Sequence, residues 1–438
     1  MLYLYARYTH LFNSFPMKEE FLHYLWRFHL LQNQLYTTEN EKIEVLNPGL
    51  LNSDAGPDFI QAKIKIDETV WAGSVEMHLK ASDWIRHRHQ FDKAYNSTIL
   101  HVVYTCDTEI KLENGETIPC LEIEGKFNAE LLEKYEQFLK SKKWIPCSGQ
   151  LANFPKIKLS VFYSRLMIER LEEKTQSILH RLEMNKNDWE ESFYQVLAGA
   201  FGLKVNQEIF QQLAESLPLK KVLWHHANLF QIEALLFGQA GLLQTSTFKD
   251  DYPRSLKKEY DYLSKKYNLK PLQGHLWKFL RIRPSGFPTL RISQFAALLA
   301  SEQNLFSKIL ETKKIDNLKL LFNVFASAYW DTHFVWDKST KVQIKKLSSD
   351  RVNLLLINVI VPFVFLYAKQ RNKEKLMERA LSFLEKLPLE KNKITAAYAN
   401  EGIEFSSALQ TQALLQLKSK YCDKRKCLTC PVGLFLIS

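Results

Sequence analysis

NSDAGPDFIQAKIKIDETVWAGSVEMHLKASDW, residues 52–84, predicts two β-strands joined by a short turn. Apolar and polar residues alternate on both sides of Asp67 and Glu68, which is the pattern of strands with one buried face. The side chains expected on the core face of the second strand are those of Trp71, Val75, Met77 and Leu79. Because successive side chains point to opposite faces, Glu76, His78 and Lys80 together face the other way.

The position of Asp58 follows from the turn between the strands. A three-residue turn centred on Asp67 places Asp58 opposite Glu76, and one centred on Glu68 places it opposite His78. A two-residue turn leaves Asp58 out of register between these two residues. In every case Asp58 lies within one pair of Glu76, and directly opposite side chains are about 5 Å apart at Cβ.

Asp58 and Glu76 are therefore candidate metal ligands. Two carboxylates this close repel each other unless a proton or a divalent cation lies between them. Mg²⁺ or Mn²⁺ bound there would also hold a phosphate oxygen, while Lys80 or His78 would stabilise the charge developing on it or orient water. The predicted catalytic set is Asp58, Glu76, His78 and Lys80. The structural alternative is that Asp58 caps the turn after Pro57 and Glu76 pairs with a lysine.

The residues around the hairpin predict a compact α+β unit that ends near residue 150. Helical spacing marks the first 36 residues and again residues 84–95, while strand patterns mark residues 42–49 and 97–105. Asn114 and Gly115 predict a further hairpin. The order of helix, three strands, helix, strand and hairpin indicates a mixed sheet.

The remainder of the chain has a different pattern. Apolar residues recur at helical spacing from Lys156 to about residue 420, which predicts a mostly α-helical domain. We expect domains at 1–150 and 151–420, followed by a cysteine-containing tail at 421–438 that packs on the rest.

The longest apolar run, Val352–Ala368, does not predict a membrane span. It is short for one and is interrupted by Asn353, Asn358 and Pro362. We interpret it as a buried helix pair or a helix broken at the proline. The first residues also lack the features of a secretion signal, so a cytoplasmic location without a membrane partner is expected.

The composition is that of a globular protein with a basic excess. Of 438 residues, 46% are hydrophobic and 24% charged, which excludes a disordered chain. Lys and Arg total 59 against 48 acidic residues, giving a net charge of +11 and favouring nucleic acid or an anionic surface as partner. Candidate phosphate contacts are Arg281, Arg283 and Arg291 around a Pro-Gly turn, and Lys424 and Arg425 near the C-terminus. A solvated loop is the alternative for the first group.

Three of the six cysteines lie close together near the C-terminus. Cys422, Cys427 and Cys430 have C-x4-C-x2-C spacing, and a fourth ligand would complete a Zn²⁺ site or an iron–sulfur cluster. Candidates for this ligand are Cys106, Cys120, Cys147 or a histidine. Cys147 is preferred because it lies between the two domains, and it would attach the tail to the N-terminal unit. The alternative is a set of reduced cysteines that bind nothing.

Several histidines are expected near the hairpin: His78, His87, His89, His101, and His10 or His29 from the first helix. Together with Asp58 and Glu76 they would suit Zn, Mn or Fe. An H-x-H pair on a helix, however, divides its two ligands between faces. His78 is the preferred functional histidine, as a phosphate contact or general base.

The hairpin resembles the PD-(D/E)xK nuclease superfamily over about residues 20–125. Pro57-Asp58 is similar to the start of that motif and Glu76 to its acidic metal ligand, while His78 stands at the lysine position and Lys80 two residues on. The resemblance implies a restriction-endonuclease-like core, and some of these nucleases carry a terminal iron–sulfur clasp. Over nearly its whole length the chain also resembles an uncharacterised bacterial family of unknown function, through GPDF, GSVEMH, SDW, HRH, AYNSTILHVVY and YCDKRKCLTCPVG.

These patterns lead to three hypotheses about function. The first is a metal-dependent nuclease-like protein that hydrolyses phosphodiester bonds in nucleic acid. The second is a nucleic-acid-binding or scaffold protein with a degenerate nuclease core, which His78 at the lysine position favours. The third is a histidine and carboxylate metalloenzyme unrelated to nucleic acid.

Overall fold

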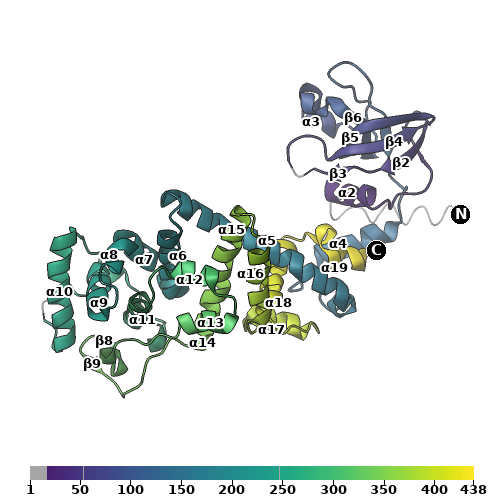
Figure 1. The fold of residues 1–438 in the computed structure, drawn as a ribbon. Coiled ribbons are helices and arrows are strands. Elements are labelled where there is room, and N and C mark those ends of the chain that lie inside the picture. The colour runs from purple at the N-terminus through teal and green to yellow at the C-terminus, as the bar shows by residue number, and fades with distance from the viewer. Residues whose placement is uncertain (1–16, 53, 246) are drawn as a thin grey trace. The chain divides into compact units, whose positions relative to one another are not determined.

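The chain forms two compact units, shown in a computed structural model that describes residues 17–438 other than 53 and 246 (Figure 1). The first unit comprises the chain up to Leu159 together with Lys418–Ser438, and the second comprises Ser160–Leu417. The first contains a mixed sheet and the second is mostly helical, so the predicted α+β class is confirmed. The cysteine-containing tail belongs to the first unit.

The sheet of the first unit has the strand order β1-β2-β4-β5-β6-β7, and β3 pairs with β4. Strands β2, β4 and β5 are antiparallel neighbours, whereas β6 and β7 continue the sheet in parallel with β5. The strands are β1 (Leu35–Tyr36), β2 (Lys42–Asn47), β3 (Leu50–Leu51), β4 (Phe59–Ile66), β5 (Thr69–Lys80), β6 (Thr98–Thr105) and β7 (Cys120–Glu122). The strands predicted before Asn114 are thus present, whereas the hairpin predicted at Asn114 and Gly115 is reduced to one bridge between Lys111 and Thr117.

Each face of the sheet has its own cover. Helices α2 (Glu19–Arg27) and α4 (Ala129–Lys140) pack on the face that carries Val75 and Met77, and this core also contains Cys427 and Ile437 from the tail. The tail itself forms η9 (Cys427–Thr429) and α19 (Pro431–Ile437). The opposite face is covered by α3 (Asp83–Arg86), η1 (His89–Phe91) and η2 (Lys93–Ser97), with Trp84 and Tyr95 packed against Val103.

Two details of this region correct the sequence predictions. Trp71 is 47% exposed rather than part of the core, because the first residues of β5 extend beyond the helices that cover the sheet. The helix expected over residues 84–95 ends at Arg86, and Arg88 has a left-handed backbone with φ 64°. Phe91, placed on the apolar side of that helix by its spacing, is 75% exposed.

The register of β4 and β5 decides where Asp58 lies. The strands are joined by a two-residue turn, since Ile66 pairs with Thr69 and Ala62 with Gly73. An irregularity between Phe59 and Ala62, where Gln61 has φ 59°, then shifts the pairing so that Phe59 faces Val75. Continuing by one pair places Asp58 opposite Glu76. A bulge therefore brings into register the residue that the turn alone would leave out of register.

The second unit is built from helices with one short strand pair. The helices that reach or lie in it are α5 (Lys156–Met184), α6 (Trp189–Phe201), α7 (Leu203–Ser216), α8 (Leu219–Leu223), α9 (Leu229–Gln239), α10 (Asp251–Tyr267), α11 (Pro288–Ser301), α12 (Leu305–Glu311), α13 (Ile315–Leu321), α14 (Ser349–Leu355), α15 (Val361–Gln370), α16 (Glu374–Lys386), α17 (Lys393–Asn400) and α18 (Ala408–Gln416). Strands β8 (His333–Val335) and β9 (Lys338–Ser339) form a two-stranded hairpin that the sequence did not predict.

The apolar run of the second unit forms one continuous helix, Ser349–Gln370, rather than a pair. Pro362 has no N–H and its ring would collide with a carbonyl in a regular helix, and the wider turn η7 (Leu356–Ile360) lies just before it. This helix is long and apolar enough to cross a membrane, but 72% of its most apolar window is buried. Such burial is the environment of a core helix.

Candidate metal centre

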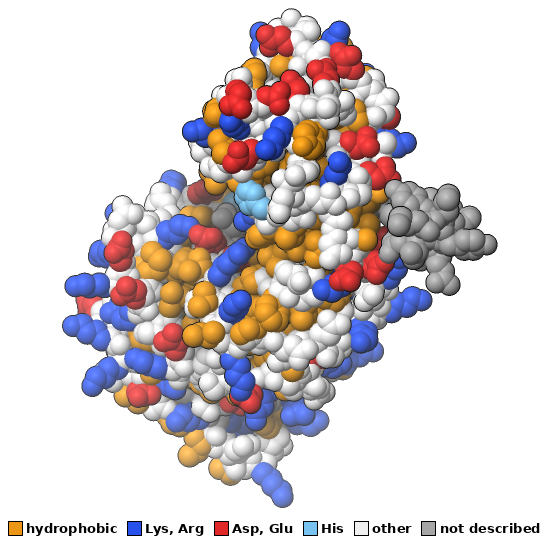
Figure 2. Space-filling view, turned by 90° about the vertical axis from the view of Figure 1, so that its right-hand side faces the viewer, with side chains coloured by type: hydrophobic (Ala, Val, Ile, Leu, Met, Phe, Trp, Pro, Cys, Tyr) orange, Lys and Arg blue, Asp and Glu red, His pale blue; other side chains and the backbone are white. Residues whose placement is uncertain are grey.

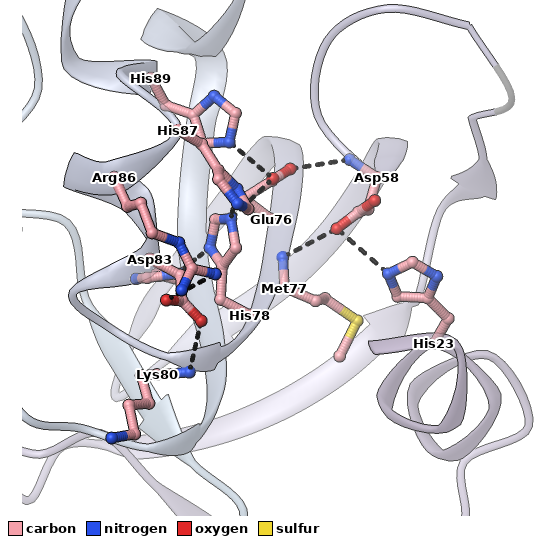
Figure 3. A network of polar contacts seen from close by, with 11 residues as sticks. His23, Asp58, Glu76, Met77, His78, Lys80, Asp83, Arg86, His87 and His89 are labelled. Carbon is pink, nitrogen blue, oxygen red and sulfur yellow. Dashed lines mark hydrogen bonds and ion pairs between the residues drawn. The ribbon is translucent and has the colours of Figure 1, made fainter. Parts of the chain in front are cut away.

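The face of β5 opposite the main core carries a buried polar cluster (Figure 3). Glu76 and His78 point to this face, and His101 joins them from β6, where it pairs with Glu76. These three side chains are 5%, 1% and 0% exposed. His87 and His89 approach from the segment after α3, and His87 remains exposed to solvent. Solvent can therefore reach a cluster whose floor is buried.

Three histidine donor atoms converge within the cluster, and Glu76 Oε1 adjoins two of them. His78 Nε2 lies 3.2 Å from His87 Nδ1 and 3.5 Å from Glu76 Oε1. His89 Nε2 lies 3.4 Å from the same Glu76 oxygen, and the donor atoms of the three histidines are all within 4.8 Å of one another. Ligands bound at 2.0–2.1 Å in a tetrahedron are about 3.3 Å apart. The separations of 3.2, 3.4 and 3.5 Å between neighbouring atoms are close to this value.

The chain reversal at Arg88 explains how His87 and His89 act together. In a continuous helix the two rings would point to different faces, as the H-x-H spacing predicts. The left-handed backbone of Arg88 ends α3 and starts a new turn, so both rings face Glu76 and His78. A positive φ at a non-glycine residue has no clear signature in a sequence, which is why this arrangement was not predicted.

His101 orients the ring of His78. His78 Nδ1 and His101 Nε2 are 2.8 Å apart, deep in the sheet. If Nδ1 of His78 carries the proton and donates it to His101, the lone pair of His78 Nε2 faces the convergent donors. A ligand histidine whose other nitrogen donates to a fixed acceptor is the common arrangement around protein-bound metals.

Asp58 and Glu76 are linked through the backbone as well as by their register. Glu76 Oε2 accepts a hydrogen bond from the backbone N–H of Asp58 at 3.0 Å, and Asp58 Oδ2 accepts one from Met77 N–H at 3.0 Å. His23 Nε2, from α2, lies 3.2 Å from Asp58 Oδ2. His23 was not predicted; of the first-helix candidates, His29 is exposed beyond the end of α2, and His10 lies outside the described residues.

Burial favours the uncharged forms of Glu76, His78 and His101. Burial, and then the charge of Asp58, raises the pKa of Glu76 to about 9. Burial, together with the other histidines, lowers the pKa of His78 to about 2, and burial lowers the pKa of His101 to about 3. At neutral pH and without a cation, the imidazoles of His78 and His101 are therefore neutral and Glu76 is protonated, and a divalent cation would replace that proton.

Lys80 does not join the cluster. Its side chain is exposed and points away from Glu76 and His78 (Figure 3). Its backbone N–H lies 3.3 Å from Asp83 Oδ2, and Arg86 pairs with the same carboxylate at 3.0 Å. Of the predicted catalytic set, Asp58, Glu76 and His78 are brought together and the ammonium of Lys80 is not.

A small cavity of about 220 Å³ lies between α2 and the tail, and Glu20 is the one carboxylate among its described lining residues. His23, which contacts Asp58, lines it with Arg27 and Lys426. Among the predicted phosphate contacts nearby, Lys424 is exposed, but Arg425 donates to the carbonyls of Phe138 and Ser141. Arg425 thus attaches the tail to the end of α4, whereas Lys426 lines the cavity.

Cys147 lies among the cysteines of the tail. It packs against the core that contains Cys427, and burial followed by Cys422, Cys430 and Cys427 raises the pKa of its thiol. Burial, Cys430 and Cys422 likewise raise the pKa of Cys427 to about 12. The other two cysteines considered as the fourth ligand, Cys106 and Cys120, contact each other, with 3.1 Å between their Sγ atoms.

The predicted phosphate contacts of the helical domain lie in the second unit. Arg281 and Arg283 flank η5 (Pro284–Gly286) on its N-terminal side, and Arg291 lies inside α11, buried rather than in a solvated loop. All three line one cavity of that unit.

Comparison with known proteins identifies a family. No curated protein and no solved structure gives a significant match to the chain. These comparisons do not support the remote resemblance to PD-(D/E)xK nucleases. A family model described as "Protein of unknown function (DUF2851)" matches residues 19–393, which include the histidine and carboxylate cluster and most of both units. The chain therefore belongs to the DUF2851 family, as the near full-length resemblance predicted.

Proposed function

We propose that the first unit is a metal-dependent, nuclease-like hydrolase of phosphodiester bonds. The observation that carries the proposal is the group of His78, His87 and His89, whose donor atoms all lie within 4.8 Å of one another, with Glu76 beside two of them. Imidazole nitrogen favours Mn²⁺, Fe²⁺ or Zn²⁺ over Mg²⁺, so of the two ions expected from the sequence Mn²⁺ suits this donor set. When bound, such an ion activates water and stabilises charge on a phosphate oxygen.

The remaining groups have distinct roles in this proposal. His101 holds the ring of His78 in the ligand orientation, and the lowered pKa of His78 keeps that ring neutral and excludes it as a general base. Asp58, more exposed than Glu76 and contacted by His23, is the carboxylate placed to accept a proton from water. Arg27 and Lys426 line the adjacent cavity and would contact the phosphates flanking the bond that is cleaved.

Nucleic acid is the proposed substrate for two reasons. The order α2, β2, β4, β5, α3 and β6, with β6 parallel to β5, is the order implied by the resemblance to PD-(D/E)xK nucleases. Pro57-Asp58 directly precedes β4 and Glu76 lies on β5, as in that motif. The net charge of +11 also favours a polyanion. Figure 2 shows that Lys and Arg side chains are distributed widely over one face of the molecule.

The direct test is cleavage of labelled single- and double-stranded DNA and RNA with Mn²⁺. Glu76→Gln removes the ligand charge at nearly constant volume and is expected to abolish cleavage. Glu68→Gln makes the same change in the exposed turn of the hairpin and should leave cleavage intact. Cleavage that survives in Glu76→Gln would reject this site as the catalytic centre.

A second candidate is a metalloenzyme that acts on another class of substrate. The observation favouring it is that three histidines and a carboxylate gather in the cluster, while Lys80 points away from it. Tight metal binding by the wild type, together with no cleavage and no binding of any nucleic acid, would support this candidate. Metal-independent binding of nucleic acid without cleavage would instead support the scaffold hypothesis.

We also propose a structural metal, Zn²⁺ or an iron–sulfur cluster, on Cys147, Cys422, Cys427 and Cys430. All four belong to the first unit, and Cys427 and Cys430 are 8% and 7% exposed. Metal analysis and visible absorption of protein purified without oxygen distinguish the two metals. Cys427→Ser should lose the metal and lower the melting temperature, whereas Cys106→Ser should retain it.

A further inference from the structure

Two adjoining cavities in the second unit form a basic groove. The smaller has a volume of about 820 Å³ and the larger about 1240 Å³. Arg291 of α11 and Arg351 of α14 line both cavities. The two arginines therefore stand where the two cavities meet.

The lining of this groove carries far more cations than anions. Of the described residues, five lysines and arginines and no carboxylate line the smaller cavity. Seven lysines and arginines line the larger, with Asp350 as its single carboxylate. A concave surface of one sign raises the local concentration of ligands of the opposite sign. Lysine and arginine therefore outnumber carboxylates far more strongly in this lining than in the chain as a whole, where they total 59 against 48 acidic residues.

Arg291 is the decisive residue of the groove. It is only 5% exposed, and its Nε has no hydrogen-bond partner within the described part of the chain. One terminal nitrogen donates to Gln294 Oε1 at 2.8 Å, but no carboxylate of the described residues lies within ion-pair distance of the guanidinium. A buried charge is costly unless it is paired, so an unpaired arginine beside a cavity indicates a ligand that supplies the missing anion.

Repulsion between Arg291 and the neighbouring cations makes binding of an anion in the groove more favourable. Burial, and then repulsion from Arg351, lowers the pKa of Arg291 to about 10. Lys174 lines the smaller cavity and donates to Asn358 Oδ1 at 2.9 Å and Gln412 Oε1 at 3.1 Å. Burial, and then Arg170, lowers the pKa of Lys174 to about 7. An anion bound in the groove would favour the charged form of each of these side chains.

The size and apolar part of the lining indicate the kind of anion. The larger cavity exceeds the usual range of about 300–1000 Å³ for small-molecule sites. Leu320 and Ile344 line it although they are 67% and 69% exposed. Cations beside exposed apolar side chains suit a ligand that alternates phosphates with flat, apolar faces, which is the chemistry of a nucleic-acid strand.

We propose that this groove binds the phosphate backbone of a single nucleic-acid strand, with one phosphate held by Arg291 and Arg351. The proposal rests on the second unit alone and holds whether or not the metal centre of the first unit hydrolyses its ligand. A free nucleotide carries the same phosphate groups, and a competition experiment distinguishes binding of a strand from binding of a nucleotide.

The test is fluorescence anisotropy of labelled single-stranded DNA and RNA of about 12 nucleotides, with a chelator present so that metal binding and cleavage play no part. Arg351→Gln, at the half-buried side of the groove, should weaken binding at least about fivefold and make it less dependent on salt. Arg371→Gln, an exposed arginine that lines neither cavity, is the charge-matched control and should change binding less than about twofold.

Arg291→Gln removes the buried cation itself, and its melting temperature establishes that it folds. Equal affinities for wild type, Arg351→Gln and Arg371→Gln would overturn the proposal, as would equal losses in both variants. Unlabelled ATP and inorganic phosphate are the competing probes. If ATP and phosphate displace the labelled strand only at concentrations far above those at which an unlabelled strand does, the proposal is supported. If ATP displaces it at a concentration similar to that of the unlabelled strand, the groove binds a free nucleotide and the proposal is rejected.

Discussion

The protonation of Glu76 gives the first residue-scale prediction. Its pKa is raised to about 9, so between about pH 4.5 and pH 9 the folded protein holds a proton that the unfolded chain has lost. The free energy of unfolding without metal therefore falls as pH rises through this range, by up to about 1.4 kcal/mol per pH unit. Glu76→Gln should remove this part of the pH dependence, and urea unfolding in a chelator at pH 6 and pH 9 measures it.

The control for this prediction is Glu68→Gln, whose side chain is 95% exposed. It should show the same pH dependence as the wild type. An unchanged slope in Glu76→Gln would mean that Glu76 is ionised in the folded protein without a cation, contrary to the electrostatics proposed for the centre.

His101 provides a second prediction, on metal affinity. It contributes no ligand, and its contact with His78 fixes the ring that does. His101→Ala should therefore lower the affinity for Mn²⁺ about 10- to 100-fold while the protein remains folded, the range seen when an outer partner of a ligand is removed. Titration calorimetry measures the affinity. His101→Gln, whose side-chain oxygen can accept from His78, should recover part of the loss; no recovery would indicate a purely structural role.

At the scale of single residues, the sequence predicted which residues carry the functional groups better than it predicted where their side chains point. Alternation on β5 correctly placed Glu76 and His78 on one face, and turn geometry placed Asp58 near Glu76. The same alternation failed for the ammonium of Lys80, because a long side chain at a strand end can turn away. It could not predict His23, which reaches Asp58 from a separate helix.

At the scale of elements, the chain reversal between α3 and η1 gives a third prediction. Arg88 has φ 64°, which glycine adopts without strain and a β-branched residue adopts only with strain. Arg88→Gly should preserve Mn²⁺ affinity, and Arg88→Val should lower it by displacing His87 or His89. Metal titration of the two variants, with melting temperatures, tests this; equal affinities would show that the reversal does not position the ligands.

The elements themselves followed from the sequence where the patterns were long. β4, β5 and β6 appeared at the expected residues because alternation and β-branched runs are strong signals. The bulge at Gln61 and the short helix α3 were not predicted, since both depend on positive φ values at Gln61 and Arg88. These two irregularities place Asp58, His87 and His89 at the cluster, so the unpredicted elements are those that build the site.

At the scale of the whole molecule, an N-terminal sheet and a helical region were predicted and are present. The two compact units divide at Leu159, where a first boundary near residue 150 was expected. The assignment of the C-terminal tail to the first unit depends on contacts between residues far apart in the sequence, such as Arg425 with Phe138 and Ser141. Local patterns do not encode such contacts. The basic groove could not be predicted for the same reason, because Arg291 and Arg351 come to line one cavity only when α11 and α14 fold together.

The most direct test of the proposed metal centre is anomalous X-ray diffraction from crystals of the protein grown with Mn²⁺. We predict a peak at about 2.1–2.2 Å from Glu76 Oε1, His78 Nε2, His87 Nδ1 and His89 Nε2, and its loss in Glu76→Gln. A peak bound by Asp58 and Glu76 without the histidines, or no peak in this cluster at saturating Mn²⁺, would contradict the centre proposed here.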